Sequence, residues 1–319
     1  TTELYTLSLH DALPIFGELE GIASITQPSC GLGYNELLTL NMGYNWLAHC
    51  TSIVCLDHKT EQPPYHFRNM DWDLELSDEL REMTIDVEFY RNNKPVYVMT
   101  TWVCFVGATT GMRLRNELPT AATTDHQTGY SISINYRKTD EPVGIVKNFV
   151  SGVCSFWPIE MLLRTVLEEN ESYEEALTRL STEHIMAPCY LTICGTNSKQ
   201  GAILTRKRHC DENRLQLHPT RSPFIIQTNI DHWKNEVDKE WAGNDALLHS
   251  AVDRRVTATA YLNHARQLSL ENGYEESEFA IECGFGCLAN YPNMNDETVY
   301  MNVMRPGTNL YLSRVAHHP

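Results

Sequence analysis

Short apolar runs of strand type recur along this chain and are joined by tight polar turns. Residues 50–55 (CTSIVC) form the first run, and residues 65–70 form the second after a turn at 58–64. Residues 83–90 and 96–105 repeat the pattern around the sequence Asn-Asn-Lys-Pro. Strands joined by turns this short pair antiparallel. The chain is therefore expected to build its sheets from antiparallel hairpins.

Helical periodicity divides these strands into groups. Apolar residues recur at three- and four-residue steps in 33–49, after Pro158 and in 244–270, while Ser172 and Glu175 have the spacing of a capping box. Further strands are predicted at 130–136, 189–195, 201–205, 215–218, 224–228, 299–303 and 309–313. This order is typical of one α+β domain with helices layered on antiparallel sheets.

The chain is strongly acidic. Its 319 residues include 41 acidic and 25 basic side chains, which gives a formal net charge of −16 at neutral pH. A protein that binds nucleic acid needs the opposite sign, so no nucleic-acid partner is expected. Protonation of the 13 histidines would remove most of this negative charge. In an acidic compartment the protein would therefore be repelled less by an anionic lipid surface. The alternative is that the chain is simply one of many acidic soluble proteins.

The first residues do not read as natural sequence. Residues 5–15 (YTLSLHDALPI) resemble the translation of a sequencing-adapter oligonucleotide. We interpret residues 1–15 as an assembly artefact and place the natural sequence from Phe16 or Gly17 onward. The lack of a signal peptide therefore carries no information about where the protein works.

The ten cysteines do not form a metal-binding pattern. No CxxC pair and no Cys/His cluster has zinc spacing, so neither a metal nor a cofactor is predicted. Cys55, Cys104, Cys189 and Cys194 lie in apolar strand-like runs and are expected to be buried thiols, with disulfide pairing left open. One glycosylation acceptor at 170–172 is mild support for a secreted glycoprotein.

Cys50 is the strongest candidate for a nucleophile. It begins the first strand run, and Arg68 and Asp71 return on the next strand, where hairpin pairing could bring both near the thiol. A guanidinium beside a thiol favours the thiolate. The alternative is a structural ion pair between Arg68 and Asp71 at the end of the hairpin.

Several motifs extend this observation over the whole natural chain. They are CTSIV at 50–54, RNMDW at 68–72, FVGATTG at 105–111, SISINYR at 131–137, LLRTVLEENESYEEAL at 162–177, APCYLTICGT at 187–196, ILTR at 203–206, QTNIDHWK at 227–234 and DRRVTA at 253–258. In this order the chain resembles the acid ceramidase and N-acylethanolamine acid amidase family of N-terminal-nucleophile cysteine hydrolases. The resemblance implies a four-layer αββα sandwich of antiparallel sheets.

The resemblance also implies an inactive precursor that cuts itself between His49 and Cys50. Residues 16–49 would then be the C-terminal part of the small (alpha) subunit, and residues 50–319 would be the catalytic (beta) subunit. Together they would form one domain and an alpha/beta heterodimer. The cut would free the α-amine of Cys50, which can act as the general base for its own thiol.

The family roles map onto named positions. The resemblance makes Cys50 the nucleophile and base, and it assigns Asp71 to the α-amine and Arg68 to the thiolate. It assigns Asn229 to the oxyanion through its side-chain amide, and it places Arg254, rather than the adjacent Arg255, near the centre. Each of these residues could instead be a buried structural polar group.

Some positions depart from the family pattern. Tyr136 replaces an acidic residue, so it can serve the oxyanion hole through its backbone N–H but not through a carboxylate. Phe67 replaces a glycine, the loop between Cys50 and Arg68 is two residues longer, and His49 is unusual before the cut. The two inserted residues preserve the strand alternation, so they are expected to be harmless.

The expected function is hydrolysis of the N-acyl amide bond of a lipid amide, either ceramide or N-acylethanolamine. The expected partners are this substrate and a membrane surface or lipid activator, which the apolar residues 143–157 could contact unless they form a buried core helix. The expected location is lysosomal or secreted. The alternatives are a papain-like thiol protease and a non-catalytic lipid-binding relative.

Overall fold

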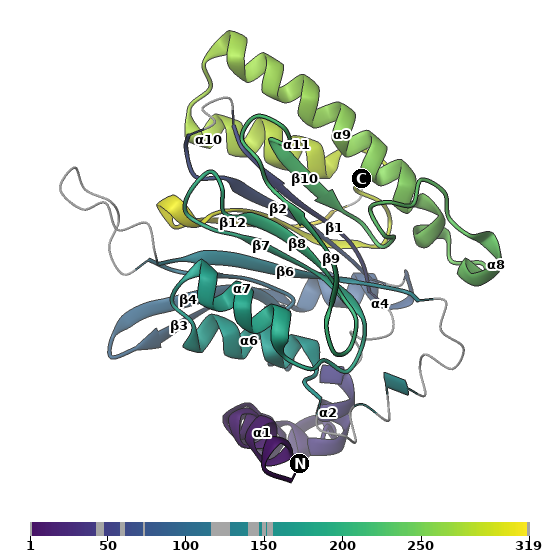
Figure 1. Cartoon of the computed structure of the whole chain (residues 1–319). Coiled ribbons are helices and arrows are strands. Elements are labelled where there is room, and N and C mark those ends of the chain that lie inside the picture. The colour runs from purple at the N-terminus through teal and green to yellow at the C-terminus, as the bar shows by residue number, and fades with distance from the viewer. Residues whose placement is uncertain are drawn as a thin grey trace.

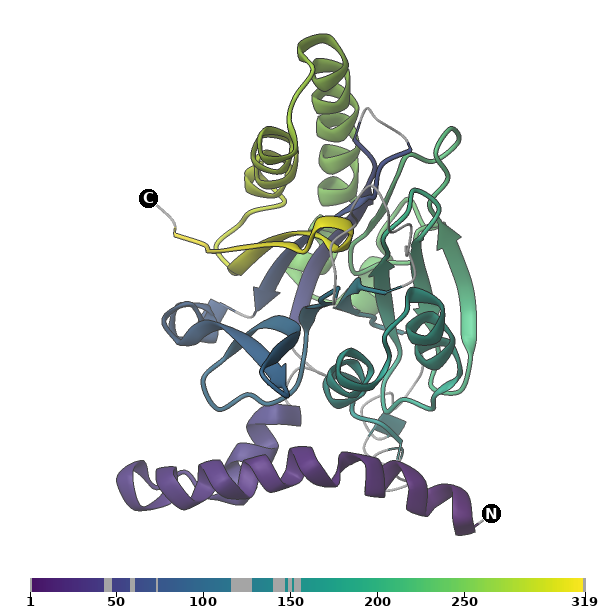
Figure 2. The same cartoon turned by 90° about the vertical axis from the view of Figure 1, so that its left-hand side faces the viewer.

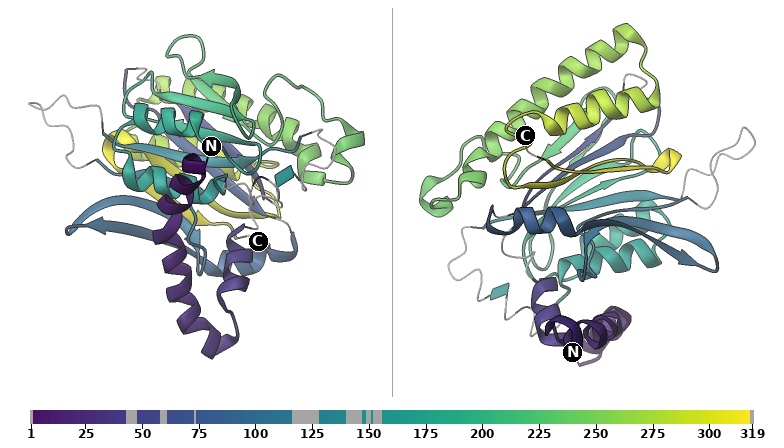
Figure 3. Two further views of the ribbon diagram at one scale, coloured as in Figure 1. Left: turned by 60° about the horizontal axis from the view of Figure 1, so that its bottom comes forward. Right: turned by 180° about the vertical axis from the view of Figure 1, so that it is seen from behind.

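Two antiparallel sheets are stacked face to face in the centre of the molecule, and helices cover both outer faces (Figure 1). The computed structural model describes residues 2–42, 48–57, 61–72, 74–115, 128–139, 147–148, 151 and 156–317. The view from behind shows the same order of helix, sheet, sheet and helix (Figure 3). The predicted α+β class and the four-layer αββα arrangement are confirmed.

The first sheet has five strands and contains Cys50. Its strand order is β10-β1-β2-β11-β12. The strands are β1 (Ala48–Cys55), β2 (Tyr65–Trp72), β10 (Phe224–Gln227), β11 (Thr298–Arg305) and β12 (Leu310–Val315). The hairpin predicted from residues 50–71 is β1 and β2, which pair antiparallel with Cys50 opposite Met70.

The second sheet has seven strands in sequence order from β3 to β9. They are β3 (Thr84–Arg91), β4 (Lys94–Trp102), β5 (Thr110–Arg113), β6 (Tyr130–Tyr136), β7 (Cys189–Cys194), β8 (Gly201–Arg206) and β9 (Asp211–Gln216). Asn92 and Asn93 make the turn between β3 and β4 with φ angles of 52° and 60°, a conformation that asparagine tolerates well.

The helices fall into an upper and a lower group. Above the five-stranded sheet lie α9 (Ala246–Asn272), α10 (Glu276–Phe279), a π-helix (Ala280–Phe285) and α11 (Gly286–Ala289). Below the seven-stranded sheet lie α6 (Ile159–Glu169) and α7 (Tyr173–Thr182), with α1 (Thr2–Cys30) and α2 (Tyr34–Met42) beneath them (Figure 2). The other helices among the described residues are α4 (Leu74–Met83), α8 (Lys239–Ala242) and a 3₁₀ turn (Pro306–Thr308).

Some predicted boundaries differ from the structure. The helix expected over 33–49 ends at Met42, and Ala48 and His49 already belong to strand β1. The strand expected at 215–218 is β9, which begins four residues earlier because an edge strand accepts polar residues on its exposed face. Most of the apolar segment 143–157 lies outside the described residues.

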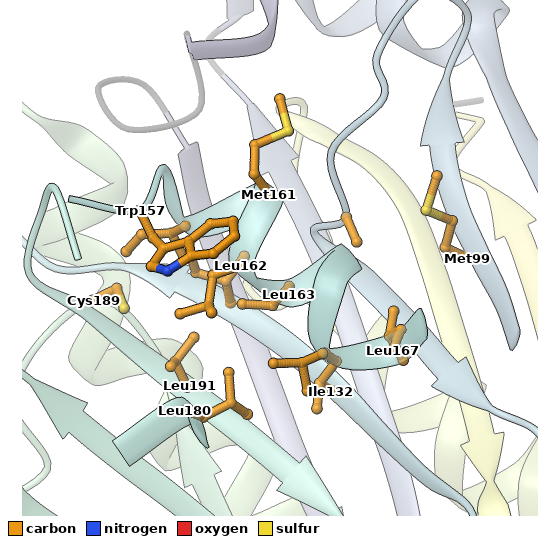
Figure 4. Packing of buried hydrophobic residues seen from close by; sticks show 14 of the residues in the cluster. Met99, Ile132, Trp157, Met161, Leu162, Leu163, Leu167, Leu180, Cys189 and Leu191 are labelled. Carbon is orange, nitrogen blue, oxygen red and sulfur yellow. The ribbon is translucent and has the colours of Figure 1, made fainter. Parts of the chain in front are cut away.

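The lower core is built around α6. Its apolar stripe packs under the seven-stranded sheet, and Leu162, Leu163, Val166 and Leu167 have no exposed surface (Figure 4). Pro158 precedes the helix at its N-cap, as predicted from the sequence. Burying four large aliphatic side chains of this kind contributes about 2 kcal/mol each to the free energy of unfolding.

Alternation along β1 and β2 sends their side chains to two different layers. Ser52 and Arg68 face the seven-stranded sheet, where they contact Asn135 of β6. Thr51 faces the opposite way and contacts Arg254 of α9. The strand that begins near Cys50 is therefore flanked by polar groups on both faces.

Nine of the ten cysteines lie in the described residues, and all nine are free thiols. Cys55, Cys189 and Cys194 are buried as predicted, but Cys104 is only half-buried. It follows the end of β4 in a turn with a φ angle of 68°, so the strand ends before it. None of the helices in the described ranges is both long and apolar enough to span a bilayer.

Candidate active site

The Cys50 sulfur lies in a fully buried position between the two sheets. Arg68 Nη2 donates a hydrogen bond to Cys50 Sγ at 2.8 Å, and Cys50 Sγ is 3.6 Å from Met70 Sδ. The pairing of β1 with β2 explains this geometry, because Cys50, Arg68 and Met70 have side chains on the same face of the sheet. The predicted approach of Arg68 to Cys50 is present.

Arg68 is also fully buried, and its guanidinium is satisfied by several acceptors. Nη2 donates to the Ile134 carbonyl oxygen at 2.6 Å, and Nη1 donates to Asn135 Oδ1 at 3.0 Å. A cation removed from water needs such acceptors to offset its lost hydration. These contacts come from β6, so the second sheet fixes the orientation of the guanidinium toward the thiol.

Asn135 connects the two sides of Cys50. Its Nδ2 donates to the Cys50 carbonyl oxygen at 3.0 Å and to the Gln227 carbonyl oxygen at 3.0 Å. Its Oδ1 accepts from Ser52 Oγ at 2.6 Å, in addition to Arg68. Asn135 lies in the motif SISINYR but was not predicted as a site residue. The alternation of β6 could have identified it, because Ser131, Ser133 and Asn135 share one face.

A polar chain continues from Ser52 into the sandwich. Ser52 Oγ lies 2.9 Å from Ser133 Oγ, and His66 Nε2 lies 2.9 Å from the same hydroxyl. His66 Nδ1 lies 2.9 Å from Ser131 Oγ. Burial and the nearby Arg68 guanidinium lower the pKa of His66 to about 3, so its imidazole is neutral.

Asn229 and Arg254 hold the backbone of Cys50. Asn229 Oδ1 accepts from the Cys50 backbone N–H at 2.9 Å, and it also accepts from Arg254 Nη2 at 2.9 Å. Arg254 Nη1 donates to the Cys50 carbonyl oxygen at 2.9 Å. Arg254 is fully buried on α9, whereas Arg255 is bound to the carbonyl oxygens of Asp231 and Lys234. The choice of Arg254 over Arg255 agrees with this geometry.

Asp71 lies on the helix-facing side of β2 with no exposed surface. Its Oδ1 accepts from Thr298 Oγ1 at 2.8 Å, and its Oδ2 is 3.7 Å from Arg254 Nη1. Burial raises the pKa of this carboxyl, although the Arg254 charge opposes the shift. Among the described residues Oδ2 has no hydrogen-bond partner, although the Arg254 guanidinium lies beside it.

Tyr136 lies at the end of β6, beside the bond between His49 and Cys50. Its carbonyl oxygen accepts from Asn229 Nδ2 at 3.0 Å, and its ring lies edge-on to His49 with centroids 6.4 Å apart. All six predicted residues, Cys50, Arg68, Asp71, Tyr136, Asn229 and Arg254, are therefore brought together around one strand end.

The groups around Cys50 suit acyl transfer. A thiol beside a guanidinium, an amide side chain and two buried charged groups can stabilise an attacking sulfur and a developing oxyanion. Within the part of the chain that the structure describes, no group of three or more His, Cys, Asp or Glu residues could hold a metal ion.

Comparison with known proteins agrees with this chemistry. Residues 50–218 match the linear amide C–N hydrolases of the choloylglycine hydrolase family. The chain is 30% identical to acid ceramidase of Mus musculus over 303 residues, which covers 91% of this chain and 67% of that protein. It is 28% identical to N-acylethanolamine-hydrolyzing acid amidase of Oryctolagus cuniculus over 304 residues, which covers 95% of this chain and 73% of that protein.

A solved structure gives the same result. The Caenorhabditis elegans ortholog of N-acylethanolamine-hydrolyzing acid amidase matches with a TM-score of 0.63 and 26% sequence identity. The match covers 84% of this chain and all of that one, so the two proteins share the same arrangement of sheets and helices. This chain is accordingly an amide hydrolase and belongs to the linear amide C–N hydrolases of the choloylglycine hydrolase family.

Proposed function

We propose that this protein is a self-processing cysteine amidase that hydrolyses the N-acyl bond of lipid amides through an acyl-enzyme on Cys50. The observation that carries the proposal is that both the side chain and the backbone of Cys50 are held by hydrogen bonds. Arg68 contacts its sulfur at 2.8 Å, while Asn229 and Arg254 contact its backbone nitrogen and carbonyl oxygen at 2.9 Å. One residue is thus held as nucleophile and as future chain terminus.

The proposed maturation is an intramolecular acyl transfer. The Cys50 thiolate, stabilised by Arg68, attacks the carbonyl carbon of His49. The carbon–nitrogen bond breaks as the nitrogen takes a proton, and a thioester joins His49 to Cys50 Sγ. Water then hydrolyses this thioester, which releases His49 as a carboxylate and restores the thiol.

After this cut the freed α-amine of Cys50 is the proposed general base. Asp71 Oδ2, which has no hydrogen-bond partner among the described residues, is a suitable acceptor for the resulting ammonium. The thiolate attacks the amide carbonyl of the substrate, and the leaving amine takes the proton that the Cys50 amine has collected. The oxyanion is proposed to lie near the Asn229 amide and the backbone N–H of Tyr136, and water releases the fatty acid.

The burial of Cys50 supports a precursor state. Its side chain has no exposed surface while the bond to His49 is intact. In the proposal, cleavage gives the sequence before Cys50 a free end, and this end moves to admit a lipid amide. Residues 16–49 and 50–319 are then the small and catalytic subunits of one heterodimer.

The proposed substrates are ceramide and N-acylethanolamine, which are the two compound classes in the names of the relatives. The proposed location is an acidic lumen such as the lysosome, or the secretory route. The word "acid" in both names supports this choice, as does the net charge of −16, which would repel an anionic membrane at neutral pH. A lipid surface or lipid activator is the proposed partner.

The papain-like alternative requires an imidazole on the Cys50 sulfur. His49 instead contacts Asp245, and His66 contacts Ser131 and Ser133. A non-catalytic lipid-binding relative would have no need for a buried guanidinium beside a thiol. Arg68 is fully buried, and its guanidinium contacts the Cys50 sulfur. Both observations favour the amidase.

The test compares the wild type with Cys50→Ala and Cys50→Ser on a ceramide and an N-acylethanolamine at acidic and at neutral pH. We expect the wild type to release fatty acid from at least one substrate, while Cys50→Ala shows no release above background. Fatty-acid release by Cys50→Ala would contradict the proposal. Binding of both lipids without turnover by the matured wild type would support the non-catalytic alternative.

A further inference from the structure

His49, the residue before Cys50, is held by a carboxylate that is distant in the sequence. His49 Nε2 lies 3.0 Å from Asp245 Oδ2, and the two side chains are 13% and 25% exposed. This contact is largely shielded from water, which strengthens it relative to an ion pair on the open surface. His49 is therefore fixed in place before any cut.

Asp245 also begins the long helix α9. Its Oδ1 accepts from the Leu248 backbone N–H at 2.9 Å, so it is the N-cap, while its other oxygen binds His49. The same helix carries Arg254, which binds the Cys50 carbonyl oxygen. Both sides of the bond between residues 49 and 50 are thus attached to one rigid element.

The other face of His49 is also supported. The ring of Tyr136 lies edge-on to it, and Asp71 is the residue opposite it on β2. The positive charge of Lys138 lowers the pKa of Asp245. The negative charge of Asp245 in turn opposes the lowering of the pKa of Arg254 that burial causes. Burial is the largest single effect and raises the pKa of Asp245, but the contacts with His49, the Leu248 N–H and Lys138 together outweigh it, so the pKa of this carboxyl is lowered.

We propose that His49 and Asp245 form a clamp that positions the peptide bond between residues 49 and 50 for self-cleavage. The inference rests on the self-cleavage described under the proposed function. Both are positioning residues, because they are proposed to hold the peptide bond in place and not to take part in its chemistry. Asn229 and Arg254 fix the amine side of the bond, and the clamp fixes the carbonyl side.

The clamp matters because the attack on a neighbouring carbonyl is geometrically demanding. A small loss of alignment between nucleophile and carbonyl lowers the rate by one to two orders of magnitude, about 10–100-fold. Because Asp245 is also the N-cap of α9, the clamp forms only when the start of this helix is in place. The clamp thereby links maturation to correct docking of α9.

The test uses Asp245→Ser, which keeps a hydroxyl for the Leu248 N–H but removes the carboxylate from His49. We expect the chain that begins at Cys50 to appear about tenfold more slowly than in the wild type. Asp238→Ser is the matched control, because Asp238 caps α8 by accepting from the Glu240 N–H at 2.9 Å. This control is expected to cleave at the wild-type rate.

A second arm leaves the helix cap intact. His49→Gln is expected to slow cleavage by a similar factor, and the double variant with Asp245→Ser is expected to be no slower than either single variant. Asp245→Asn, which keeps one oxygen for the Leu248 N–H and offers an amide N–H to His49 Nε2 when that nitrogen is an acceptor, is expected to recover part of the rate. If the two substitutions slow cleavage additively in the double variant, as merely structural roles would, the clamp is overturned.

The outcomes separate the two proposals. Cleavage of Asp245→Ser and His49→Gln at the wild-type rate overturns the clamp and leaves self-cleavage standing. A wild type that never exposes a terminus at Cys50 overturns both. If Asp245→Ser does not fold, His49→Gln decides alone, because it leaves the N-cap of α9 unchanged.

Discussion

Arg68 has no exposed surface, yet its guanidinium contacts the Cys50 sulfur, the Asn135 side chain and the Ile134 carbonyl oxygen. A buried cation is costly unless it is fully hydrogen-bonded, so the acceptors on β6 are part of the site. They hold the positive charge against the thiol, which favours the thiolate.

The sequence predicted most residues of this site, but it predicted few of the contacts that join them. Arg68 and Asp71 followed from hairpin spacing, and the family resemblance indicated Asn229 and Arg254. Asn135 and Asp245 were not identified. The alternation of β6 gives the face on which Asn135 lies but not its contact with Ser52, and the contact of Asp245 with His49 joins segments that are distant in the chain. Contacts between two sheets, or between a helix end and a strand, leave no local periodicity.

His66 makes the stability of the fold dependent on pH. Its pKa is lowered from 6.5 to about 3, first by burial and then by Arg68. Between these pH values the unfolded chain binds a proton that the folded chain does not. The free energy of unfolding therefore falls as the pH falls through this window, by up to about 1.4 kcal/mol per pH unit from this group.

We expect His66→Asn to flatten the dependence of the melting temperature on pH in this window. Differential scanning calorimetry at several pH values measures the slope directly. His264→Asn is the control, because His264 lies on the exposed surface of α9 and should leave the slope unchanged. Equal slopes for the wild type and His66→Asn would contradict this explanation.

At the scale of elements, the capping box at the start of α7 shows where local sequence is decisive. Ser172 Oγ accepts from the Glu175 N–H at 3.3 Å, and Glu175 Oε2 accepts from the Ser172 N–H at 3.1 Å. The hydrogen bond from the Ser172 backbone is the main reason that the pKa of Glu175 is lowered. Both contacts join residues three apart, so the sequence alone predicted them.

We expect Ser172→Ala to lower the free energy of unfolding by about 1 kcal/mol, because one N–H at the helix start loses its acceptor. Urea unfolding measures this change. Thr178→Ala, an exposed substitution in the middle of the same helix, is the control and should change the stability by about 0.5 kcal/mol or less. A Ser172→Ala variant as stable as the wild type would show that the cap contributes nothing.

The π-helix Ala280–Phe285 shows where local sequence fails. A Cβ atom on Gly284 would lie 2.8 Å from Val303 and 2.9 Å from Phe67, so glycine allows the helix to approach the sheet closely. No helix was predicted in this segment. Its structure depends on contacts with β2 and β11, which periodicity within the segment does not reveal.

At the scale of the whole molecule, the N-terminal helices are tied to the lower layer. Leu19 of α1 has no exposed surface, and Arg164 Nη1 of α6 donates to Glu18 Oε2 at 2.7 Å. Asn41 of α2 donates to the Cys104 carbonyl oxygen at 2.9 Å. In the proposed matured form these contacts would retain residues 16–49 without a covalent bond to the rest.

We expect Leu19→Ala to weaken this attachment by about 2–5 kcal/mol, because it leaves a cavity between α1 and the core. Size-exclusion chromatography of the cleaved protein, followed by mass spectrometry of each peak, measures how much of the N-terminal piece is lost. Ile25→Ala is the control, since Ile25 is 71% exposed on the same helix. Equal retention in both variants would contradict the proposed docking of α1.

The central claim is that one residue supplies both the nucleophile and the new chain terminus. Its most direct test is intact-mass analysis with N-terminal sequencing of the purified protein after incubation at acidic pH, in the presence and absence of a lipid amide. The account predicts a chain that begins with Cys50, an acyl mass on that residue during turnover, and a single uncut chain for Cys50→Ala. An uncut wild type that still hydrolyses the lipid amide, or a new terminus at any other residue, would contradict it.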